Sequence, residues 1–296
     1  MQSPVLAETP AQAEELSLLI QRALEEDIGE GDLTTALLIP APVEVQARVV
    51  AKAPGVLAGG SVSARVFHRA DPTLVLRQLC PEGTWVGPGD AVMEITGRAQ
   101  AILTAERVCL NFLGRLSGIA TLTRQFVEAV KGHDVKIMDT RKTTPGFRLL
   151  ERYAVRVGGG ENHRMGLFDQ VLVKDNHQAV LAGLPAGTLL QKVKEFRKTH
   201  PGVLVEIEVD RLETLEGVLE TRPDIVLLDN MDAETVSEAM QILGKRALVE
   251  VSGGITLANV AEFARAGADR ISIGALTHSA AQVDYSLDIV SPQVAG

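Results

Sequence analysis

The sequence predicts an α/β protein in which a small α+β layer precedes a parallel sheet or barrel. Two observations predict this class. After Lys131, short β-rich runs alternate with helical stretches, as in sheets whose parallel strands are joined by helices. Each run also ends in a polar or glycine-bearing cluster. The six runs are residues 135–138, 171–173, 203–209, 225–228, 247–251 and 270–273.

The N-terminal third contains a helix and a strand. Residues 16–24 carry an apolar stripe at helical spacing, and residues 43–49 alternate valine or alanine with polar side chains, which is typical of a half-buried strand. Between Gly83 and Gly97, the turn sequence at residues 87–90 predicts a connection between two strands. A lipoyl-like carrier hairpin would need a lysine at this turn, and there is none.

A long helical pattern follows, and it is expected to bridge two domains. Residues 99–131 are apolar on several faces, with a break expected at Ser117-Gly118. Further helices are expected at 212–219, 234–243 and 257–266, the last ending before Gly267.

Composition narrows the class of function. The chain has 296 residues, a formal charge of −9 and few aromatic residues, which argues against a nucleic-acid partner. No apolar run is long enough for a membrane span and the N-terminus lacks the features of a signal peptide, so we expect a cytoplasmic protein. The isolated Cys80 and Cys109 are expected to pack as small hydrophobic residues.

Positive charge is concentrated in one segment. Residues 141–177 hold seven Arg or Lys against four acids, beside Thr-Thr-Pro-Gly and Gly-Gly-Gly. Fixed cations next to glycines favour a pocket for carboxylates or phosphates over a solvated surface. His163 lies in this polar run, which favours a role in the site over a buried structural histidine.

The polar strand ends converge if the strands are parallel, because their carboxyl ends form one face. Ser252-Gly253-Gly254 and Ile273-Gly274-Ala275 are expected to hold a phosphate, although such glycines also make tight turns. Glu206 and Glu208 point to the same side of one strand, and we favour Glu208 because it is nearer the strand end. Glu208 and Asp229 suit Mg²⁺ carried in by a polyphosphate, or a salt bridge to the cations.

Several long strings in this sequence resemble the quinolinate phosphoribosyltransferases, the nicotinate-nucleotide pyrophosphorylases (carboxylating). The resemblance covers almost the whole chain. It rests on residues 26–35, 106–120, 139–146, 158–164, 174–177, 228–230 and 252–254.

The resemblance implies an N-terminal α/β sandwich, residues 1–116, and an open, incomplete α/β barrel, residues 117–276, with the tail from about 277 to 296 packing back on the first domain. It also implies a homodimer, and it leaves open whether dimers assemble further. Each dimer site would take Arg107 from the neighbouring subunit.

The resemblance further implies a pentosyltransferase that joins quinolinate to phosphoribosyl pyrophosphate with loss of CO₂. Arg107, Arg141, His163, Arg164 and Lys174 would hold quinolinate, with Thr140 beside them. Lys142, Glu208 and Asp229 would be catalytic, the two acids holding Mg²⁺, largely through water. The 5′-phosphate would bind at Ser252, Gly253, Gly254, Ile273, Gly274 and Ala275.

Two alternatives stay open at this point. One is a related phosphoribosyltransferase that acts on nicotinate or another heterocycle, although a monocarboxylate does not require five cations. The other is a non-catalytic phosphate-binding barrel, against which the intact set of Glu208, Asp229 and the cations argues.

Overall fold

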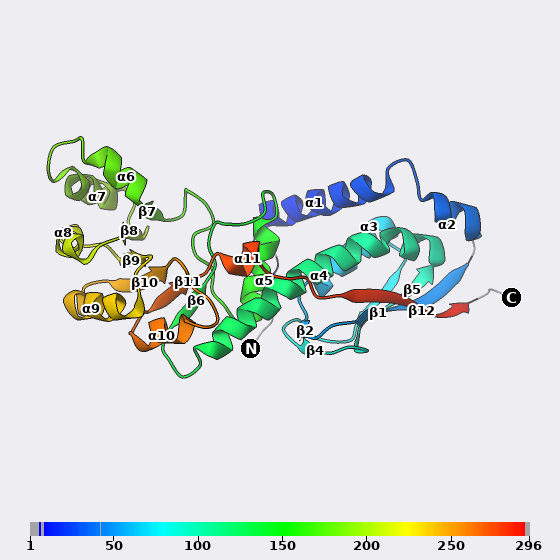
Figure 1. Cartoon of the computed structure of the whole chain (residues 1–296). Coiled ribbons are helices and arrows are strands. Elements are labelled where there is room, and N and C mark those ends of the chain that lie inside the picture. Colours follow the sequence, from blue (N-terminus) through cyan, green and yellow to red (C-terminus); the bar gives the residue numbers. More distant parts are fainter. Residues whose placement is uncertain (1–5, 7–8, 42, 294–296) are drawn as a thin grey trace. The chain divides into compact units, whose positions relative to one another are not determined.

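The computed structural model describes residues 6, 9–41 and 43–293, which form two compact units (Figure 1). The N-terminal unit comprises Met1–Arg124, Thr143–Gly159 and Leu276–Gly296. The parallel-sheet unit comprises Gln125–Lys142 and Gly160–Ala275. The chain therefore passes between the units four times.

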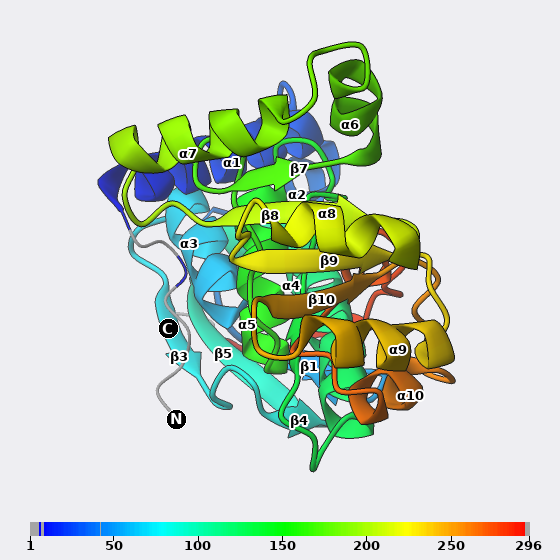
Figure 2. The same cartoon turned by 90° about the vertical axis from the view of Figure 1, so that its left-hand side faces the viewer.

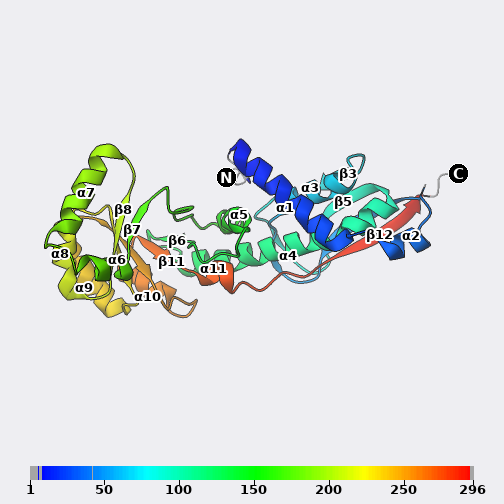
Figure 3. The ribbon, with the colours of Figure 1, turned by 90° about the horizontal axis from the view of Figure 1, so that it is seen from above.

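An antiparallel sheet forms the base of the N-terminal unit. Its strand order is β12-β1-β5-β3, and helices α3 and α4 lie along it in Figure 1. The helix α1 packs on α3, as Figure 3 shows from above. The elements are α1 (Pro10–Ile28), α2 (Leu33–Leu38), β1 (Glu44–Ala51), β2 (Gly55–Val56), α3 (Gly60–Ala70), β3 (Val75–Gln78), β4 (Trp85–Val86), β5 (Ala91–Arg98), α4 (Ala99–Ala129), α5 (Arg148–Gly158), α11 (Ala275–His278) and β12 (Tyr285–Gln293).

Alternation fixes the register of β1. Val45, Ala47, Val49 and Ala51 are buried while the residues between them are partly or fully exposed, so the predicted strand is confirmed. The strand pairs with β5 on one side and with β12 on the other. The carboxyl-terminal strand is thus part of this sheet.

The turn at residues 87–90 connects two strands, as predicted, but they do not pair with each other. The short strand β4 pairs with β2, whereas β5 pairs with β1 and β3. The Gly89 N–H donates to the carbonyl of Ala51, which directs the chain from one sheet into the other. The segment is therefore a connection between two strands and not a hairpin.

The long helix α4 is continuous from Ala99 to Ala129, so the break expected at Ser117-Gly118 was also wrong. These residues are small because other backbone comes close. A Cβ on Gly118 would lie 2.0 Å from the carbonyl oxygen of Ala281. The Ser117 hydroxyl is within hydrogen-bonding distance of the Ala58 backbone. The helix also buries Cys109, and burial raises the pKa of its thiol to about 12, so this cysteine packs as an inert apolar residue.

All six predicted strands of the second unit are confirmed, and they form one parallel sheet. Its order is β6-β11-β10-β9-β8-β7, with every neighbouring pair parallel. Figure 2 shows α8, α9 and α10 covering one face. The elements are β6 (Lys136–Met138), β7 (Val171–Val173), α6 (Asp175–Leu181), α7 (Thr188–Thr199), β8 (Val205–Val209), the 3₁₀ turn Leu212–Thr214, α8 (Leu215–Leu219), β9 (Ile225–Asp229), α9 (Ala233–Leu243), β10 (Leu248–Ser252), α10 (Val260–Arg265) and β11 (Arg270–Ser272).

Strands of this sheet are buried on both faces, which explains their nearly continuous apolar sequences. The β8 strand carries two acids on one face, Glu206 and Glu208, while Val205, Ile207 and Val209 occupy the other. Within the described part of the chain, no helix combines the length and apolar composition needed to cross a membrane.

Candidate active site

The carboxyl ends of the parallel strands bring most of the predicted site residues to one edge of the sheet. Asp229 and Ser252 are register partners at the ends of β9 and β10, and Ser252 pairs with Ser272 on β11. The segment 139–142 follows β6, and Lys174 follows β7. Because parallel strands end at the same edge, residues from distant parts of the sequence share one site.

Two arginines in this unit lie close enough to repel each other. Burial and then the charge of Arg141 lower the pKa of Arg164, which is 8% exposed. The Arg164 Nη1 donates to the Gln170 carbonyl at 3.1 Å. Among the described residues, the buried Arg141 Nε has no hydrogen-bond partner. Two adjacent guanidinium groups with a spare buried donor form a site suited to an anion.

His163 is held next to these arginines by a buried acid. The Asp139 carboxylate accepts from the His163 backbone N–H at 2.7 Å and from the Asn162 side chain at 2.6 Å. Glu161 in turn bridges Met138, which extends the sheet beyond β6. The His163 ring lies 3.0 Å from Glu206 and 3.3 Å from Glu250. The direct substrate contact expected for His163 stays a prediction.

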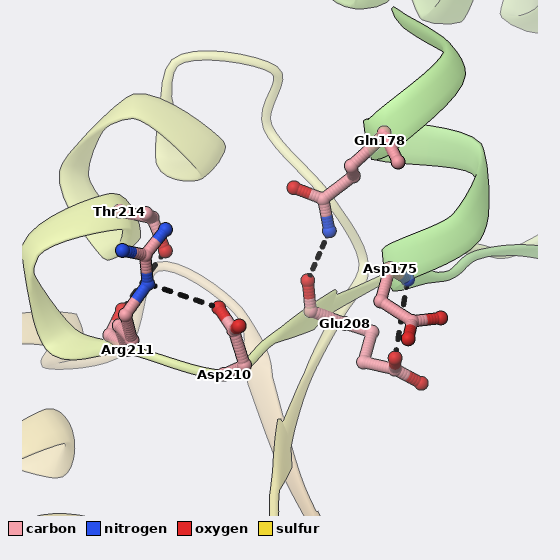
Figure 4. Close-up of a pocket in the computed structure, with 7 residues that line it drawn as sticks. Asp175, Gln178, Glu208, Asp210, Arg211 and Thr214 are labelled. Carbon is pink, nitrogen blue, oxygen red and sulfur yellow. Dashed lines mark hydrogen bonds and ion pairs between the residues drawn. The ribbon is translucent and has the colours of Figure 1, made fainter. Parts of the chain in front are cut away.

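Lys174 and Glu208 form an ion pair with an Nζ–Oε2 distance of 2.9 Å. The other oxygen of Glu208 accepts from the Asp175 backbone N–H at 3.2 Å, and its carbonyl accepts from Gln178 (Figure 4). A pocket of about 270 Å³ opens beside Glu208 and continues past Asp210 to Thr214. The Glu208 carboxylate is thus fixed in direction by Lys174 and by the Asp175 backbone.

Asp229 lies within the electrostatic reach of Glu208. Burial and then the Glu208 charge raise the pKa of Asp229, while Lys174 and Lys142 act in the opposite direction. Asn230 donates from its side chain to the Asp229 carboxylate at 2.7 Å. The four charged residues therefore form one cluster of two acids and two lysines.

The glycine loop after β10 touches the loop after β9. Gly253 has φ +93°, and a Cβ there would lie 2.2 Å from the Asn230 Oδ1. Only glycine allows this backbone to pass so near. The second predicted phosphate loop, Ile273–Ala275, follows β11, and the Ile273 N–H donates to the Met138 carbonyl at 3.0 Å. Thr140 accepts from the Lys142 N–H at 3.1 Å and so shapes the loop after β6.

Not all of the predicted cations lie in this unit. Arg107 is exposed on α4, which places it in the N-terminal unit. The other three cations of the 141–177 segment, Arg148, Arg152 and Arg156, lie on α5 of that unit. The parallel-sheet unit itself contributes Arg141, Lys142, Arg164 and Lys174.

Sequence reasoning assigned no role to three buried acids, namely Asp139, Glu206 and Glu250. A signal was available for two of them. Glu206 lies two residues before Glu208, and Glu250 lies two residues before Ser252. Because side chains alternate between the two faces of a strand, each acid points to the same face as the later residue, deeper in the sheet. Asp139 directly precedes the segment that carries Arg141.

Comparisons with known proteins agree with this geometry. Residues 32–117 match the family model described as the quinolinate phosphoribosyl transferase N-terminal domain, and residues 119–288 match that of its C-terminal domain. The chain is 42% identical over 277 residues to the nicotinate-nucleotide pyrophosphorylase [carboxylating] of Mycobacterium leprae, covering 91% of this chain and 95% of that one. It is 39% identical to the chloroplastic enzyme of that name from Arabidopsis thaliana, over 93% and 83% of the two chains.

Solved structures give the same result. NadC from Streptococcus pyogenes is similar with a TM-score of 0.87 and 38% identity, covering 96% of this chain and 99% of that one. The nicotinate-nucleotide pyrophosphorylase from Francisella tularensis has a TM-score of 0.88 and 34% identity, covering 97% and 100%. Human nicotinic acid phosphoribosyltransferase, at 13% identity and a TM-score of 0.59 over 96% of this chain and 74% of that one, shares the fold alone.

Proposed function

The chain belongs to the quinolinate phosphoribosyltransferase family, and we infer that it transfers the phosphoribosyl group of phosphoribosyl pyrophosphate to the ring nitrogen of quinolinate. The reaction loses CO₂ and yields nicotinate mononucleotide and pyrophosphate, a step of NAD biosynthesis. The protein is thus a pentosyltransferase. The relatives that carry this name match nearly the full length of the chain.

The adjacent arginines are the observation that carries the substrate assignment. Arg141 and Arg164 repel each other, and Arg141 keeps a buried donor without a partner in the described residues. A dicarboxylate would relieve this repulsion and supply the missing acceptor, whereas a monocarboxylate would neutralise half of the charge. We assign the quinolinate carboxylates to Arg141, Arg164 and Lys174, with His163 in the same group.

The acid pair fits Mg²⁺. Burial and then the Glu208 charge raise the pKa of Asp229 even with Lys174 and Lys142 nearby, so a divalent cation beside the two carboxylates would relieve the remaining repulsion. Carboxylate oxygens are the hard ligands that Mg²⁺ prefers, and Mg²⁺ usually keeps several waters. Glu208 and Asp229 would hold the ion, mainly through water, and the ion would neutralise the charge of the pyrophosphate leaving group.

The remaining contacts concern the donor. We assign Ser252, Gly253 and Gly254, with Ile273, Gly274 and Ala275, to the 5′-phosphate, because a Cβ on Gly254 would have no atom within 4 Å, so its backbone lies open to a phosphate. Lys142, which acts electrostatically on Asp229, lies on the donor side, with Thr140 shaping its loop. Lys142, Glu208 and Asp229 are the proposed catalytic residues.

The chemistry follows from charge. Loss of pyrophosphate leaves positive character at C1 of the ribose, and the carboxylates of Glu208 and Asp229 favour that charge. The pyridine nitrogen forms the new bond to C1. Once the nitrogen is quaternary, its positive charge stabilises the electron pair that stays on ring carbon 2 when the bond to the carboxylate breaks. CO₂ leaves, and carbon 2 takes up a proton from water. The cations hold the ring in position, and no general base is required.

We also propose that the protein is a cytoplasmic homodimer in which Arg107 completes the neighbouring site. The exposure of Arg107 on α4 supports this assignment, because nothing in its own environment buries the charge. Neither nucleic acid nor membrane is proposed as a partner.

Incubation with Mg²⁺ and phosphoribosyl pyrophosphate, with quinolinate and nicotinate in parallel, tests the proposal. Mononucleotide should form from quinolinate. Turnover of nicotinate instead would indicate a related phosphoribosyltransferase, and binding of the donor without turnover of either base would indicate a non-catalytic barrel.

A further inference from the structure

The parallel-sheet unit contains a buried cluster of one histidine and two acids. The acids lie two residues before Glu208 and Ser252, near the strand ends. The His163 Nε2 lies 3.0 Å from Glu206 Oε2 and 3.3 Å from Glu250 Oε1. Both carboxylates are fully buried, and 7% of the imidazole is exposed. None of the catalytic assignments uses the two acids, although buried acids are costly unless they are paired.

The second nitrogen of the ring also faces the protein. The Arg164 backbone N–H donates to the His163 Nδ1 at 2.7 Å, so this nitrogen acts as an acceptor. Since the Nε2 faces two carboxylates, that nitrogen acts as the donor. These contacts orient the ring into the sheet interior and leave it poorly placed to donate to a substrate carboxylate.

The same acid reaches Arg164 by a second route. Glu206 Oε2 accepts from the Gln170 side-chain amide at 2.6 Å, and the Gln170 carbonyl accepts from Arg164 Nη1 at 3.1 Å. Glu206 is therefore linked to the backbone of Arg164 through His163 and to its guanidinium through Gln170. The four residues form a closed hydrogen-bonded circuit.

Neighbouring groups fix the circuit in place. Ser272 donates to the Glu250 Oε1, and Asp139 anchors the His163 backbone. Burial lowers the pKa of His163, but its hydrogen bonds to Glu206 and Glu250 outweigh burial and raise it to about 10. Burial also raises the pKa of Glu206. Both shifts favour a proton shared between the Nε2 of His163 and the two carboxylates.

We propose that Glu206 and Glu250 are positioning residues that hold the His163 ring toward the sheet interior. His163 then supports the backbone of Arg164, so that it acts on quinolinate through Arg164. This inference rests on the proposed function. It changes the role of His163 and gives one to two acids that have none in the proposed mechanism.

A pair of substitutions at Glu206 separates positioning from charge. Glu206→Gln and Glu206→Leu remove the same charge and have similar size, but only Gln keeps an oxygen that accepts from His163 and Gln170. Glu206→Leu should raise the KM for quinolinate about tenfold, as expected for one lost hydrogen bond to a charged group, and leave the KM for phosphoribosyl pyrophosphate unchanged. Glu206→Gln should stay within about twofold of the wild type for both substrates.

The sign of the effect is decisive. Removing a negative charge near a dianion should tighten quinolinate binding if the role were electrostatic. Equal KM values for the two variants, or a lower KM for Glu206→Leu, would overturn the proposal. So would a parallel rise in the KM of both substrates, because that indicates general disruption of the unit. Glu250→Gln and Glu250→Leu repeat the comparison on a different strand.

A second measurement is made on the wild-type protein and uses a variant only to identify the signals. Nitrogen-15 spectra of histidine-labelled wild-type protein should show the His163 Nδ1 unprotonated, and saturating quinolinate should leave the signals of both nitrogens in place. His163→Asn identifies the resonances. A protonated Nδ1, or a shift of either signal on binding, would contradict the proposal that His163 faces inward and supports Arg164.

The three donor atoms also lie within 4.8 Å of one another, as metal ligands would. Elemental analysis of the purified protein therefore belongs to the test. A stoichiometric transition metal would overturn the positioning role, since the ion would take the lone pairs that the circuit uses. If the wild type turns over quinolinate but the variants or the spectra contradict the positioning role, the proposed function stands. If the wild type does not turn over quinolinate, the proposed function itself is wrong.

Discussion

Lys174 Nζ lies 2.9 Å from Glu208 Oε2, so a cation assigned to the acceptor substrate and an acid assigned to the donor form one ion pair. The Glu208 side chain is nearly buried, whereas about half of Lys174 is exposed. An incoming carboxylate or a cation can therefore compete for either member of this pair. With the proposed assignments, this pair would couple the binding of the two substrates.

The acid limb of the activity profile should report Asp229. Burial and Glu208 raise its pKa, and the ionised form is the one that the mechanism needs. Activity should therefore fall as the pH drops through a value above that of an ordinary aspartate. Glu208→Gln removes the like charge, so it should move the acid limb of kcat/KM to lower pH while lowering the maximum rate. An acid limb that does not move in Glu208→Gln would assign it to another group.

Arg164 should contribute mainly to quinolinate binding. Arg164→Ala should raise the KM for quinolinate by about 10- to 100-fold, as expected for a lost charge-assisted hydrogen bond, with a much smaller change for phosphoribosyl pyrophosphate. Steady-state kinetics with each substrate varied in turn measures both values. Arg265→Ala, on the exposed side of α10, is the matched control. Equal losses for both substrates would remove Arg164 from the carboxylate site.

The N-terminal unit contains a buried ion pair whose loss should destabilise it. Arg115 donates to Glu151 at 2.6 Å, and Glu151 also accepts from the Thr144 N–H at 3.1 Å. Arg115→Met would leave a buried carboxylate without its cation and should lower the free energy of unfolding by about 3–5 kcal/mol. Urea denaturation measures the change. Lys131→Met breaks the exposed pair with Glu128 and should cost at most about 1 kcal/mol; similar losses in the two variants would contradict the account.

Two helical glycines should respond oppositely to alanine. In Gly118→Ala the new Cβ would lie 2.0 Å from the Ala281 carbonyl oxygen, so the segment around Ala281 would have to move. The variant should unfold at clearly lower temperature. Gly217→Ala, on α8, has no atom within 4 Å of its Cβ and should be neutral or stabilising by up to about 1 kcal/mol. Thermal unfolding of both variants checks this, and a tolerated Gly118→Ala would refute the close approach.

The strands could be predicted because apolar runs and their polar ends are local signals. The six parallel strands of the second unit lie where the sequence indicated, and so does the alternating strand at β1. The change of sheet within residues 83–97 and the unbroken course of α4 through Ser117-Gly118 could not be predicted. In both places a glycine lies against backbone from a distant part of the chain, namely Ala51 and Ala281. No local sequence pattern shows such contacts.

The charged site was only partly accessible from sequence. Composition pointed to Arg141, Arg164 and Lys174, because positive charge is unusual in this acidic chain. Sequence favoured Glu208 over Glu206 on position along the strand, but it gave no reason for an acid at 206. That reason is a contact with His163, which lies 43 positions earlier and reaches Glu206 only because the chain folds back over the sheet. A hydrogen-bonded circuit between residues so far apart in the sequence can be seen only in the folded structure.

The fate of the carboxylate next to the ring nitrogen of quinolinate distinguishes the proposed reaction from its alternatives. Quinolinate carrying carbon-13 in that carboxylate should give labelled CO₂, unlabelled nicotinate mononucleotide and pyrophosphate in equal amounts, and only when Mg²⁺ and phosphoribosyl pyrophosphate are present. Nicotinate should give no mononucleotide under the same conditions. A mononucleotide that retains the label, or faster turnover of nicotinate, would contradict the account.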